Sequence, residues 1–467
     1  MIRYVAVIDL GKSNTKLALV DTHNACELNV VSESASVTTT GLYPAINHLV
    51  IERFLISAFK ELGSLHPIDA ITVTTHGATA ALIDKQGELV LPVLDYECPL
   101  PDDLANDYAQ HRPSFDQTGS PRLPGGLNIG AQLFWQQAVY PQQFALAQTL
   151  LTWPQYWVFR LTGERYNDIT SLGAHSDLYN PLKQCYSSLL ETLQWTRLMP
   201  PTRQPGSLIN VTNTNMTEQL GLKAPLPVYS GIHDSNASLV PHLLANKRPF
   251  SVVSTGTWFI SMAIGGEPIT LAEKSDTLLN VNAFGEAVPS ARFMGGRERE
   301  LIIAGTDHTT ADQPITVTDF LSDETANATM LMPSSVAGTG PFPDSKMQWL
   351  GPACTNPALR DLVVSFYLAL MTDQCLRLIG SRGPTYIEGP LAHDSAYTSM
   401  LQVVSQRDVY VSDSVTGTSI GAAMLIKAPL VSVTTNACQV EAHTQQQLAA
   451  YAARWEAALK SHVIKDT

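Results

Sequence analysis

The sequence predicts an α/β protein with two related halves, and three observations support this fold class. Apolar strand-like runs alternate with helix-like segments in the first half. An apolar strand, a short turn of small or hydroxyl residues and another apolar strand occur near the N-terminus and again after residue 249. Between them, residues 199–229 are rich in proline and glycine and lead into GIHDSNASL. We therefore predict a domain boundary there, which gives domains 1–230 and 231–467.

The composition excludes several classes of partner. Of 467 residues, 45% are hydrophobic and 15% are charged, as in ordinary globular proteins, and the net charge of −13 repels nucleic acid and anionic membranes. No apolar run approaches the roughly 20 residues that span a bilayer, and Asp9 interrupts the apolar N-terminal run, so we expect no signal peptide. The six cysteines lie far apart, which predicts buried, reduced thiols in a cytoplasmic protein.

The elements of the first half follow in order. Residues 4–10 form a nearly continuous apolar run, typical of a strand buried on both faces, and 16–20 are a second strand joined to it by a small polar turn. Residues 47–62 place apolar side chains at helical spacing, and Gly63 follows as a stop. Residues 69–75 then predict a strand that ends at His76.

The second half repeats the hairpin and adds helices. Residues 250–254 and 258–264 are apolar strands on either side of the turn TGT. Beyond them the sequence predicts a helix over 359–379, a strand over 385–388, a helix over 418–427 whose small residues allow close packing, and a loop over 333–352.

The first motif with chemical potential is the turn after the N-terminal strand, DLGKSNTK. Asp9 ends the strand, and the small residues that follow let backbone N–H groups converge on a phosphate, to which Lys16 adds positive charge. A purely structural Asp-Gly turn is the alternative. The turn Thr255-Gly256-Thr257 matches it in the second half, and two such turns facing each other would hold a polyphosphate. Alone, the second turn would be interpreted as a plain hairpin turn.

The second motif is His233-Asp234, which follows a predicted strand at the domain boundary, where clefts form. Phosphoryl transfer needs mainly positioning, charge neutralisation and one group that accepts the hydroxyl proton, and the carboxylate of Asp234 suits this role. The alternative is that Asp234 only caps the helix that follows.

Polar residues at other strand ends are candidates for binding sugar hydroxyls. His76 closes one strand, and Asp95 follows the predicted strand LVLPVL; a core histidine and a solvated acidic turn are the alternatives. Gly389 lies between a strand and a helix, where backbone could approach a flat base, or it is a loop glycine. We expect the tryptophans to be core residues rather than ligand platforms, and they are Trp135, Trp153 and Trp157.

Taken in order, several segments resemble the FGGY family of carbohydrate kinases over nearly the whole chain, most closely its rhamnulokinase and fuculokinase branch. These segments are VAVIDLGKSNTKLALVD, TTHGATAALID, LTWPQYWVFRLTGE, VYSGIHDSNASL, STGTWFIS, IEGPLAHDSA and GTSIGAAML. The resemblance implies two actin-like (ribonuclease H-like) domains with a cleft between them, in which ATP and Mg²⁺ bind above a buried ketose or polyol.

The resemblance also implies a role for each candidate residue. Asp9 would orient Mg²⁺ through water, and Asp234 would be the catalytic base and contact the substrate. His76 and Asp95 would contact the sugar, and Gly389 would adjoin the adenine. Two loops would bind the phosphates: Gly11, Lys12, Ser13 and Lys16 in the first, and Thr255, Gly256 and Thr257 in the second.

The chain departs from the family pattern at three places. Lys12 stands where the family usually has a hydroxyl or small residue, and Lys16 where it commonly has arginine. Glu97-Cys98 follow Asp95 where arginine is often found, and Glu388-Gly389 stand in place of a glycine pair.

These observations favour an enzyme, an ATP-dependent kinase that phosphorylates a hydroxyl of a small neutral ketose, including deoxy-ketoses such as rhamnulose or fuculose. A catalytically weak sugar- or nucleotide-binding protein with the same fold is the alternative, although Asp9 and Asp234 are both present. A chaperone-like actin-fold ATPase is a third reading, but no polypeptide-binding segment is recognisable after the second half. We expect a small-molecule sugar as partner, neither nucleic acid nor membrane, and consider a homodimer as the assembly.

Overall fold

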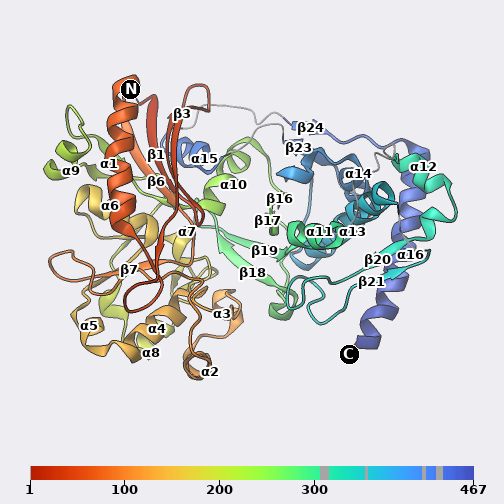
Figure 1. Cartoon of the computed structure of the whole chain (residues 1–467), viewed down its shortest axis with the longest axis horizontal. Coiled ribbons are helices and arrows are strands. Elements are labelled where there is room, and N and C mark those ends of the chain that lie inside the picture. Colours follow the sequence, from red (N-terminus) through yellow and green to blue (C-terminus); the bar gives the residue numbers. More distant parts are fainter. Residues whose placement is uncertain (1, 305–314, 353–355, 413–416, 428–434, 467) are drawn as a thin grey trace. The chain divides into compact units, whose positions relative to one another are not determined.

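The computed structural model describes residues 2–304, 315–352, 356–412, 417–427 and 435–466, with side chains to residue 462. It divides into two compact units (Figure 1). Unit 1 comprises 1–245, 279–287 and 416–432, and unit 2 comprises 246–278, 288–415 and 433–467. Each unit is therefore made from more than one stretch of chain, whereas the sequence suggests a single boundary after residue 230. The assignment of domains 1–230 and 231–467 stays a prediction.

Unit 1 is built on a seven-stranded mixed sheet. Strand β1 pairs antiparallel with β2 on one side and parallel with β6 on the other, and β15 runs parallel to the end of β6. The strands are β1 (Tyr4–Leu10), β2 (Asn14–Asp21), β3 (Cys26–Ser34), β6 (Ala70–Thr75), β13 (Leu208–Val211), β14 (Pro227–Tyr229) and β15 (Ile232–His233).

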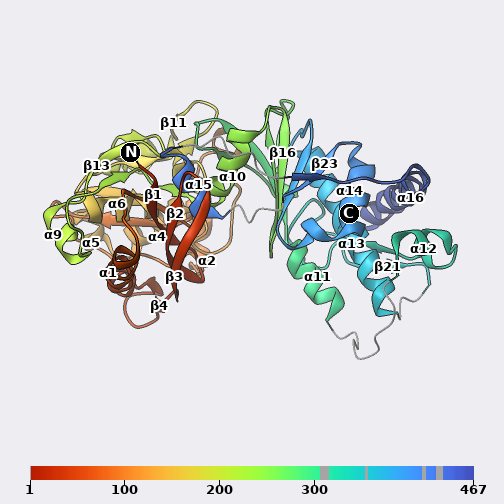
Figure 2. The same ribbon diagram turned by 90° about the horizontal axis from the view of Figure 1, so that it is seen from above.

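Alternate residues of β1 face two different helical layers, as the period of two in a strand requires. Ala6, Ile8 and Leu10 pack with α1 (His48–Leu65) and α6 (Trp153–Thr162). Val5 and Val7 pack with α10 (Asp234–Ala245) and α15 (Thr418–Met424). Figures 1 and 2 show these two helix pairs on opposite sides of the strands. Asp9 shares the face of Val5 and Val7 and therefore points toward α10 and α15.

Close packing of α10 against α15 depends on a glycine, as the small residues in the sequence predict. A Cβ on Gly421 would lie 1.8 Å from the carbonyl oxygen of Ala237, so no side chain fits at that position.

Unit 1 also contains short strands and helices outside this sheet and its covering helices. They are β4 (Val37–Thr38), β5 (Ala45–Ile46), β7 (Ala80–Ile83), α2 (Asp102–His111), α3 (Phe115–Thr118), α4 (Ile129–Val139), α5 (Pro141–Leu146), β8 (Thr149–Thr152), β9 (Asn167–Asp168), α7 (Ile169–Leu172), β10 (Tyr179–Asn180), β11 (Cys185–Tyr186), α8 (Leu189–Thr192), β12 (Thr202–Arg203) and α9 (Thr214–Gln219).

The second sheet also has seven strands and repeats the arrangement around β1. Strand β16 pairs antiparallel with β17 and parallel with β22, as β1 does with β2 and β6. Its strands are β16 (Phe250–Thr255), β17 (Phe259–Ile264), β18 (Thr277–Val281), β19 (Ala287–Phe293), β22 (Thr385–Glu388), β23 (Val409–Ser412) and β24 (Thr435–Ala437). The mixed α/β class with two actin-like domains is therefore confirmed.

A large apolar core supports unit 2, in which the central helix α13 (Pro357–Leu378) contributes residues from Leu362 to Leu376. The other elements are α11 (Gly295–Ile303), α12 (Val317–Ser322), β20 (Met330–Met332), β21 (Gln348–Leu350), α14 (Ser395–Ser405) and α16 (Ala442–Asp466). Within the described residues, no helix has both the length and the apolarity needed to cross a bilayer.

Several local expectations differ from the structure. Gly63, expected to stop the first helix, lies inside α1. The predicted strand LVLPVL contains only two isolated bridges, at Leu89 and Leu94, because Pro92 between them has no N–H to donate to a ladder. The predicted loop 333–352 includes strand β21, which pairs with β20. The described cysteines are free thiols, but only Cys98 and Cys375 among them are buried; Cys26 and Cys438 are partly buried and Cys185 is exposed. Cys354 lies outside the described residues. The tryptophans at 135, 153 and 157 are buried core residues, as predicted.

Candidate active site

The candidate site in unit 1 lies where three neighbouring strands end. Asp9 of β1 pairs in register with Thr74 of β6, and His233 of β15 pairs with Thr75. The parallel strands β1, β6 and β15 therefore bring their carboxyl ends to one edge of the sheet, where ligands bind in open α/β sheets. The chain continues from these ends into the loop at Gly11, into His76 and into Asp234.

Asp9 is a buried carboxylate held by the start of α15. The Thr418 hydroxyl donates to its Oδ2 at 2.5 Å and the Ser419 hydroxyl at 3.4 Å. Burial raises the pKa of Asp9, while the hydrogen bond from Thr418 and the charge of Lys16 act in the opposite direction. Lys16 is placed there by the antiparallel register, which sets it opposite Asp9.

Asp234 begins helix α10, and its Oδ1 accepts from the backbone N–H of Ser235 at 2.6 Å. The Nε2 atom of His233 lies 3.3 Å from the same oxygen. Burial raises the pKa of Asp234, opposed first by the nearby His76. Asp234 therefore lies at the start of a helix, as the structural alternative expects. The structure also places it beside His233 and His76, and a residue that only starts a helix needs no such neighbours.

Two hydrogen bonds hold His233, one at its ring and one at its backbone. The side-chain amide of Asn236 contacts Nδ1 at 3.1 Å, and the backbone N–H of His233 donates to the Thr170 hydroxyl at 3.1 Å. Thr170 is bonded in turn to Asp168, which caps α7 and is fully buried. Burial lowers the pKa of His233 to about 4, so its imidazole is neutral near pH 7.

Asp9, Asp234 and the predicted sugar residue Asp95 share one pattern. In each, one carboxylate oxygen is held by hydrogen bonds. The other oxygen has no hydrogen-bond partner among the residues that the structure describes. A carboxylate held in this way keeps its orientation and leaves one acceptor for a ligand.

The predicted sugar residues lie together with Lys12 in unit 1. The ring of Tyr96 packs edge-on against His76, with centroids 5.4 Å apart. The Lys12 ammonium pairs with Asp95, lies 3.2 Å from Glu97 and sits 4.5 Å from the Tyr96 ring centroid. Burial lowers the pKa of His76, although its backbone hydrogen bond to Gly77 acts in the opposite direction.

The remaining residues of the first loop form the turn between β1 and β2. The Gly11 N–H donates to the carbonyl of Asn14 at 2.9 Å, and the Ser13 carbonyl accepts from Ala35. The Ser13 side chain is exposed. A phosphate-binding role for Gly11, Lys12, Ser13 and Lys16 stays a prediction, and the ammonium of Lys12 has acidic partners here.

A second candidate site lies wholly within unit 2. A pocket of about 620 Å³ is lined by the predicted phosphate turn at 255–257, by Gly296, Arg299 and Glu300 of α11, and by Pro390 and Leu391. The Thr255 hydroxyl donates to the Glu388 carbonyl at 2.7 Å and accepts from the Leu391 N–H at 3.1 Å. Gly389, at φ +87°, lies against Thr255, so the predicted phosphate and adenine residues of this unit are neighbours.

These residues fit the ligands that the family resemblance implies. A Cβ on Gly296 would lie 2.3 Å from the carbonyl oxygen of Gly256, so only glycine leaves the phosphate turn in place beside α11. No group of three or more metal-ligating side chains occurs in the described part of the chain. That suits Mg²⁺, which proteins usually hold through one or two carboxylates together with substrate phosphates, and Asp9 offers one open oxygen.

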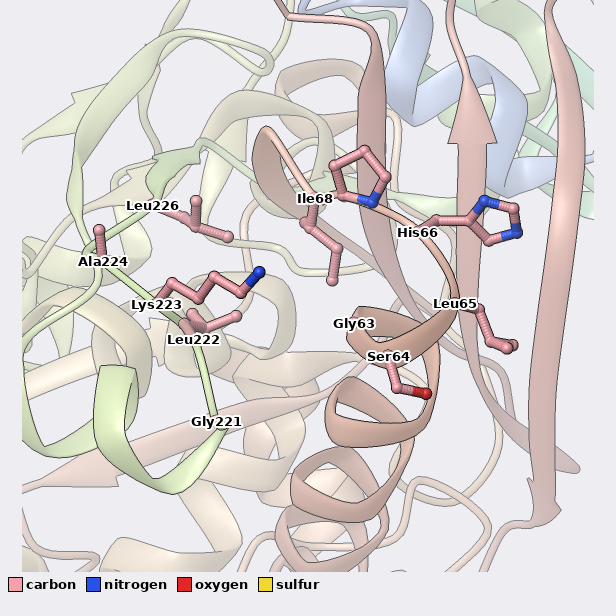
Figure 3. A pocket seen from close by; sticks show the side chains of 11 residues that line it. Gly63, Ser64, Leu65, His66, Ile68, Gly221, Leu222, Lys223, Ala224 and Leu226 are labelled. Carbon is pink, nitrogen blue, oxygen red and sulfur yellow. The ribbon is translucent and has the colours of Figure 1, made fainter.

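Another pocket, of about 470 Å³, contains none of the predicted residues (Figure 3). It lies between residues 63–68, which include the last turn of α1 and the chain just after it, and residues 221–226 after α9, and the Lys223 side chain points into it. None of the residues that line it lies at the carboxyl ends of β1, β6 or β15.

Thr418, Ser419, Asn236 and Tyr96 are site residues that the sequence analysis did not assign. The segment GTSIGAAML was noted only for its resemblance and its small residues, and its hydroxyls were the available signal. Asn236 follows Asp234 by two positions within HDSNAS. Without the fold, nothing distinguishes these residues from an ordinary helix start.

Comparison with known proteins agrees with this architecture. Residues 4–241 match the N-terminal domain of the FGGY family of carbohydrate kinases, and residues 247–434 match the C-terminal domain of carbohydrate kinase FGGY. The chain belongs to the FGGY family of carbohydrate kinases, as the sequence predicts.

Individual relatives refine this result. L-fuculokinase from Salmonella typhi is 29% identical over 277 residues, which cover 56% of this chain and 57% of that protein. L-fuculokinase from Escherichia coli K12 is 30% identical over 275 residues, which cover 55% of this chain and 56% of that protein. The matches thus span little more than half of these curated relatives, and they agree with the predicted fuculokinase branch.

Solved structures match over the whole chain. A carbohydrate kinase from Novosphingobium aromaticivorans is 32% identical with a TM-score of 0.90, covering 99% of both chains. A ligand-bound xylulose kinase from Lactobacillus acidophilus has a TM-score of 0.78 at 15% identity and full coverage of both chains, which shows a shared fold.

Proposed function

We propose that this protein is an ATP-dependent kinase that phosphorylates a hydroxyl of a small neutral ketose, with 6-deoxy-ketoses such as L-fuculose as the first candidates. The observation that carries the proposal is the carboxylate of Asp234 at the strand ends of an FGGY kinase: Oδ1 is held by Ser235 and lies 3.3 Å from His233 Nε2, His76 is nearby, and Oδ2 is open among the described residues. The L-fuculokinase relatives supply the candidate sugar.

In the proposed reaction Asp234 accepts the proton of the attacked sugar hydroxyl at its open oxygen. The hydroxyl oxygen forms the new bond to phosphorus, and bound MgATP supplies the phosphoryl group and leaves as ADP. Asp95 accepts a hydrogen bond from another sugar hydroxyl and thereby orients the substrate. Asp9 would orient Mg²⁺ through water, and the turn 255–257 with Gly389 would hold the nucleotide. Mg²⁺ as the metal, a cytoplasmic location and a homodimeric assembly are parts of the same proposal.

The acidic residues near the predicted sugar site also favour a neutral substrate over an acidic one. The carboxylates of Asp95, Glu97 and Asp234 all lie close enough to act on Tyr96, next to the predicted sugar residue His76, and the Lys12 ammonium contacts Asp95 and Glu97. An acidic sugar would be repelled by this arrangement, and a neutral ketose would not.

A panel of pentuloses, ketohexoses, their 6-deoxy forms, polyols and gluconate, assayed by ADP release in the presence of Mg²⁺, tests the proposal. We expect ADP release to depend on a neutral ketose, with little release from gluconate. Saturable sugar binding without any ADP release would instead favour the non-catalytic binding protein.

A further inference from the structure

The most informative contact outside the predicted roles is the one between Lys12 and Asp95. The sequence analysis places Lys12 in the first phosphate loop and Asp95 in the sugar site. The structure joins them by an ion pair across 83 residues of sequence. The side chain of Lys12 is 25% exposed and that of Asp95 only 7%, so the ammonium reaches inward to a nearly buried carboxylate.

We propose that Lys12 is a positioning residue for the sugar, which acts by anchoring Oδ1 of Asp95 so that Oδ2 presents a fixed acceptor to a substrate hydroxyl. This inference rests on the proposed function of the site.

The hydrogen bonds of Asp95 support this division of its two oxygens. Oδ1 receives both the Lys12 ammonium and the backbone N–H of Glu97, the latter at 3.0 Å. Oδ2 has no hydrogen-bond partner in the described ranges. The main chain at Asp95 is also fixed, because its N–H donates to Pro44 and its carbonyl accepts from Cys98.

Charge explains why an ammonium is needed at this place. Asp95 and Glu97 are two carboxylates separated by one residue, and Lys12 contacts both. The other groups that face the ammonium are the ring of Tyr96 and, through that ring, His76, whose burial disfavours its charged form. Without Lys12 the two carboxylates would repel each other, and Asp95 would lose the stronger of its two anchors.

Lys12 and Lys16 have different acidic partners, which predicts different roles for them. Lys16 faces Asp9, and its charge opposes the rise that burial causes in the pKa of Asp9. Lys12 is instead neutralised by two acidic partners, so its charge is less available to a phosphate. We therefore expect Lys12 to govern sugar affinity, and Lys16 to govern nucleotide affinity.

The test measures sugar affinity directly, by isothermal titration of L-fuculose, or of the best sugar of the panel, in the absence of nucleotide. Lys12→Met should raise the dissociation constant of the sugar about tenfold, which corresponds to ~1.4 kcal/mol, and leave the KM for MgATP near the wild-type value. Lys12→Arg, which keeps the charge, should restore much of the lost affinity. Lys85→Met removes an exposed lysine of the same unit and should change neither quantity.

A double-mutant cycle shows whether Lys12 acts through Asp95. In an Asp95→Asn background, Lys12→Met should cost much less sugar affinity than in the wild type, because residues that act through one contact are not additive.

Two failures can be told apart. If the wild type neither binds nor phosphorylates any sugar of the panel, the proposed function fails and this inference fails with it. If the wild type is active but Lys12→Met leaves sugar affinity unchanged and raises the KM for MgATP, only this inference is overturned, and Lys12 belongs to the phosphate loop.

Discussion

Asn236 and His233 form a side-chain contact that determines which nitrogen of the histidine carries the proton. The Asn236 amide nitrogen lies 3.1 Å from His233 Nδ1. An amide nitrogen can only donate, so Nδ1 accepts and the proton of the neutral ring is on Nε2. Nε2 is the atom that lies 3.3 Å from Asp234 Oδ1, so the tautomer presents an N–H to the carboxylate.

Asn236 acts on the reaction through His233 and Asp234, so removing its amide should reduce turnover although Asn236 itself does not contact the substrate. We expect Asn236→Ala to lower kcat roughly tenfold, a fraction of the 10² to 10⁴ that a general base contributes, because His233 can then turn a lone pair toward Asp234. Ser238→Ala removes a hydroxyl on the same helix whose one hydrogen bond to the described part of the chain goes to the Ser235 carbonyl, and it should have near-normal kcat. Equal losses in the two variants would mean a general effect on α10.

The stability of the protein should depend on pH through His233. Burial lowers its pKa to about 4 from an ordinary 6.5. Below pH 6.5 the unfolded chain therefore binds a proton that the folded protein rejects, so stability falls as pH falls toward 4. For one such group the loss between pH 7.5 and 5 is about 2 kcal/mol.

Urea unfolding of the wild type and of His233→Gln at both pH values measures this contribution. Other groups titrate in both proteins and cancel in the difference. We expect the wild type to lose about 2 kcal/mol relative to the variant on acidification. A difference that does not change with pH would mean that His233 titrates alike in the folded and unfolded states.

The nucleotide site should depend on the absence of a side chain at Gly296. A Cβ there would lie 2.3 Å from the Gly256 carbonyl oxygen and displace the turn 255–257. Gly296→Ala should raise the KM for MgATP at least about tenfold, since shifting the turn removes more than one hydrogen bond to the phosphates, while sugar affinity stays unchanged. Gly63→Ala, at a helical position whose new Cβ would have its nearest neighbour at 4.0 Å, is the control and should behave as wild type. A normal KM in Gly296→Ala would separate this pocket from nucleotide binding.

Local patterns in the sequence predict several central strands well, because such strands are rich in buried apolar and β-branched residues. The strand at Tyr4–Leu10 and the strand at Thr385–Glu388 have the predicted ends. Pro92 shows the limit of apolarity as a signal, since the run around it could not form a ladder.

The contacts of the site were beyond sequence reasoning for a different reason. Asp9 was recognised, but Thr418, which donates to it, is 409 residues away in the chain. Lys12 was recognised as a departure from the family pattern, yet its partner Asp95 was assigned to another ligand. Such pairs are distant in the sequence, and they meet only in the folded chain, where α15 packs against β1 and the loops at Lys12 and Asp95 come together.

The central claim is that Asp234 is the base of the reaction, and Asp234→Asn tests it most directly. Asparagine starts a helix about as well as aspartate, so the substitution preserves the helix-start role and removes only the proton acceptor. Steady-state ADP release with the best sugar of the panel, alongside calorimetric titration of ADP, gives both readouts. The account predicts that kcat falls by at least about 10² while the dissociation constant of ADP stays at the wild-type value. A variant that turns over at a near-normal rate would contradict it and leave Asp234 with a structural role at the start of α10.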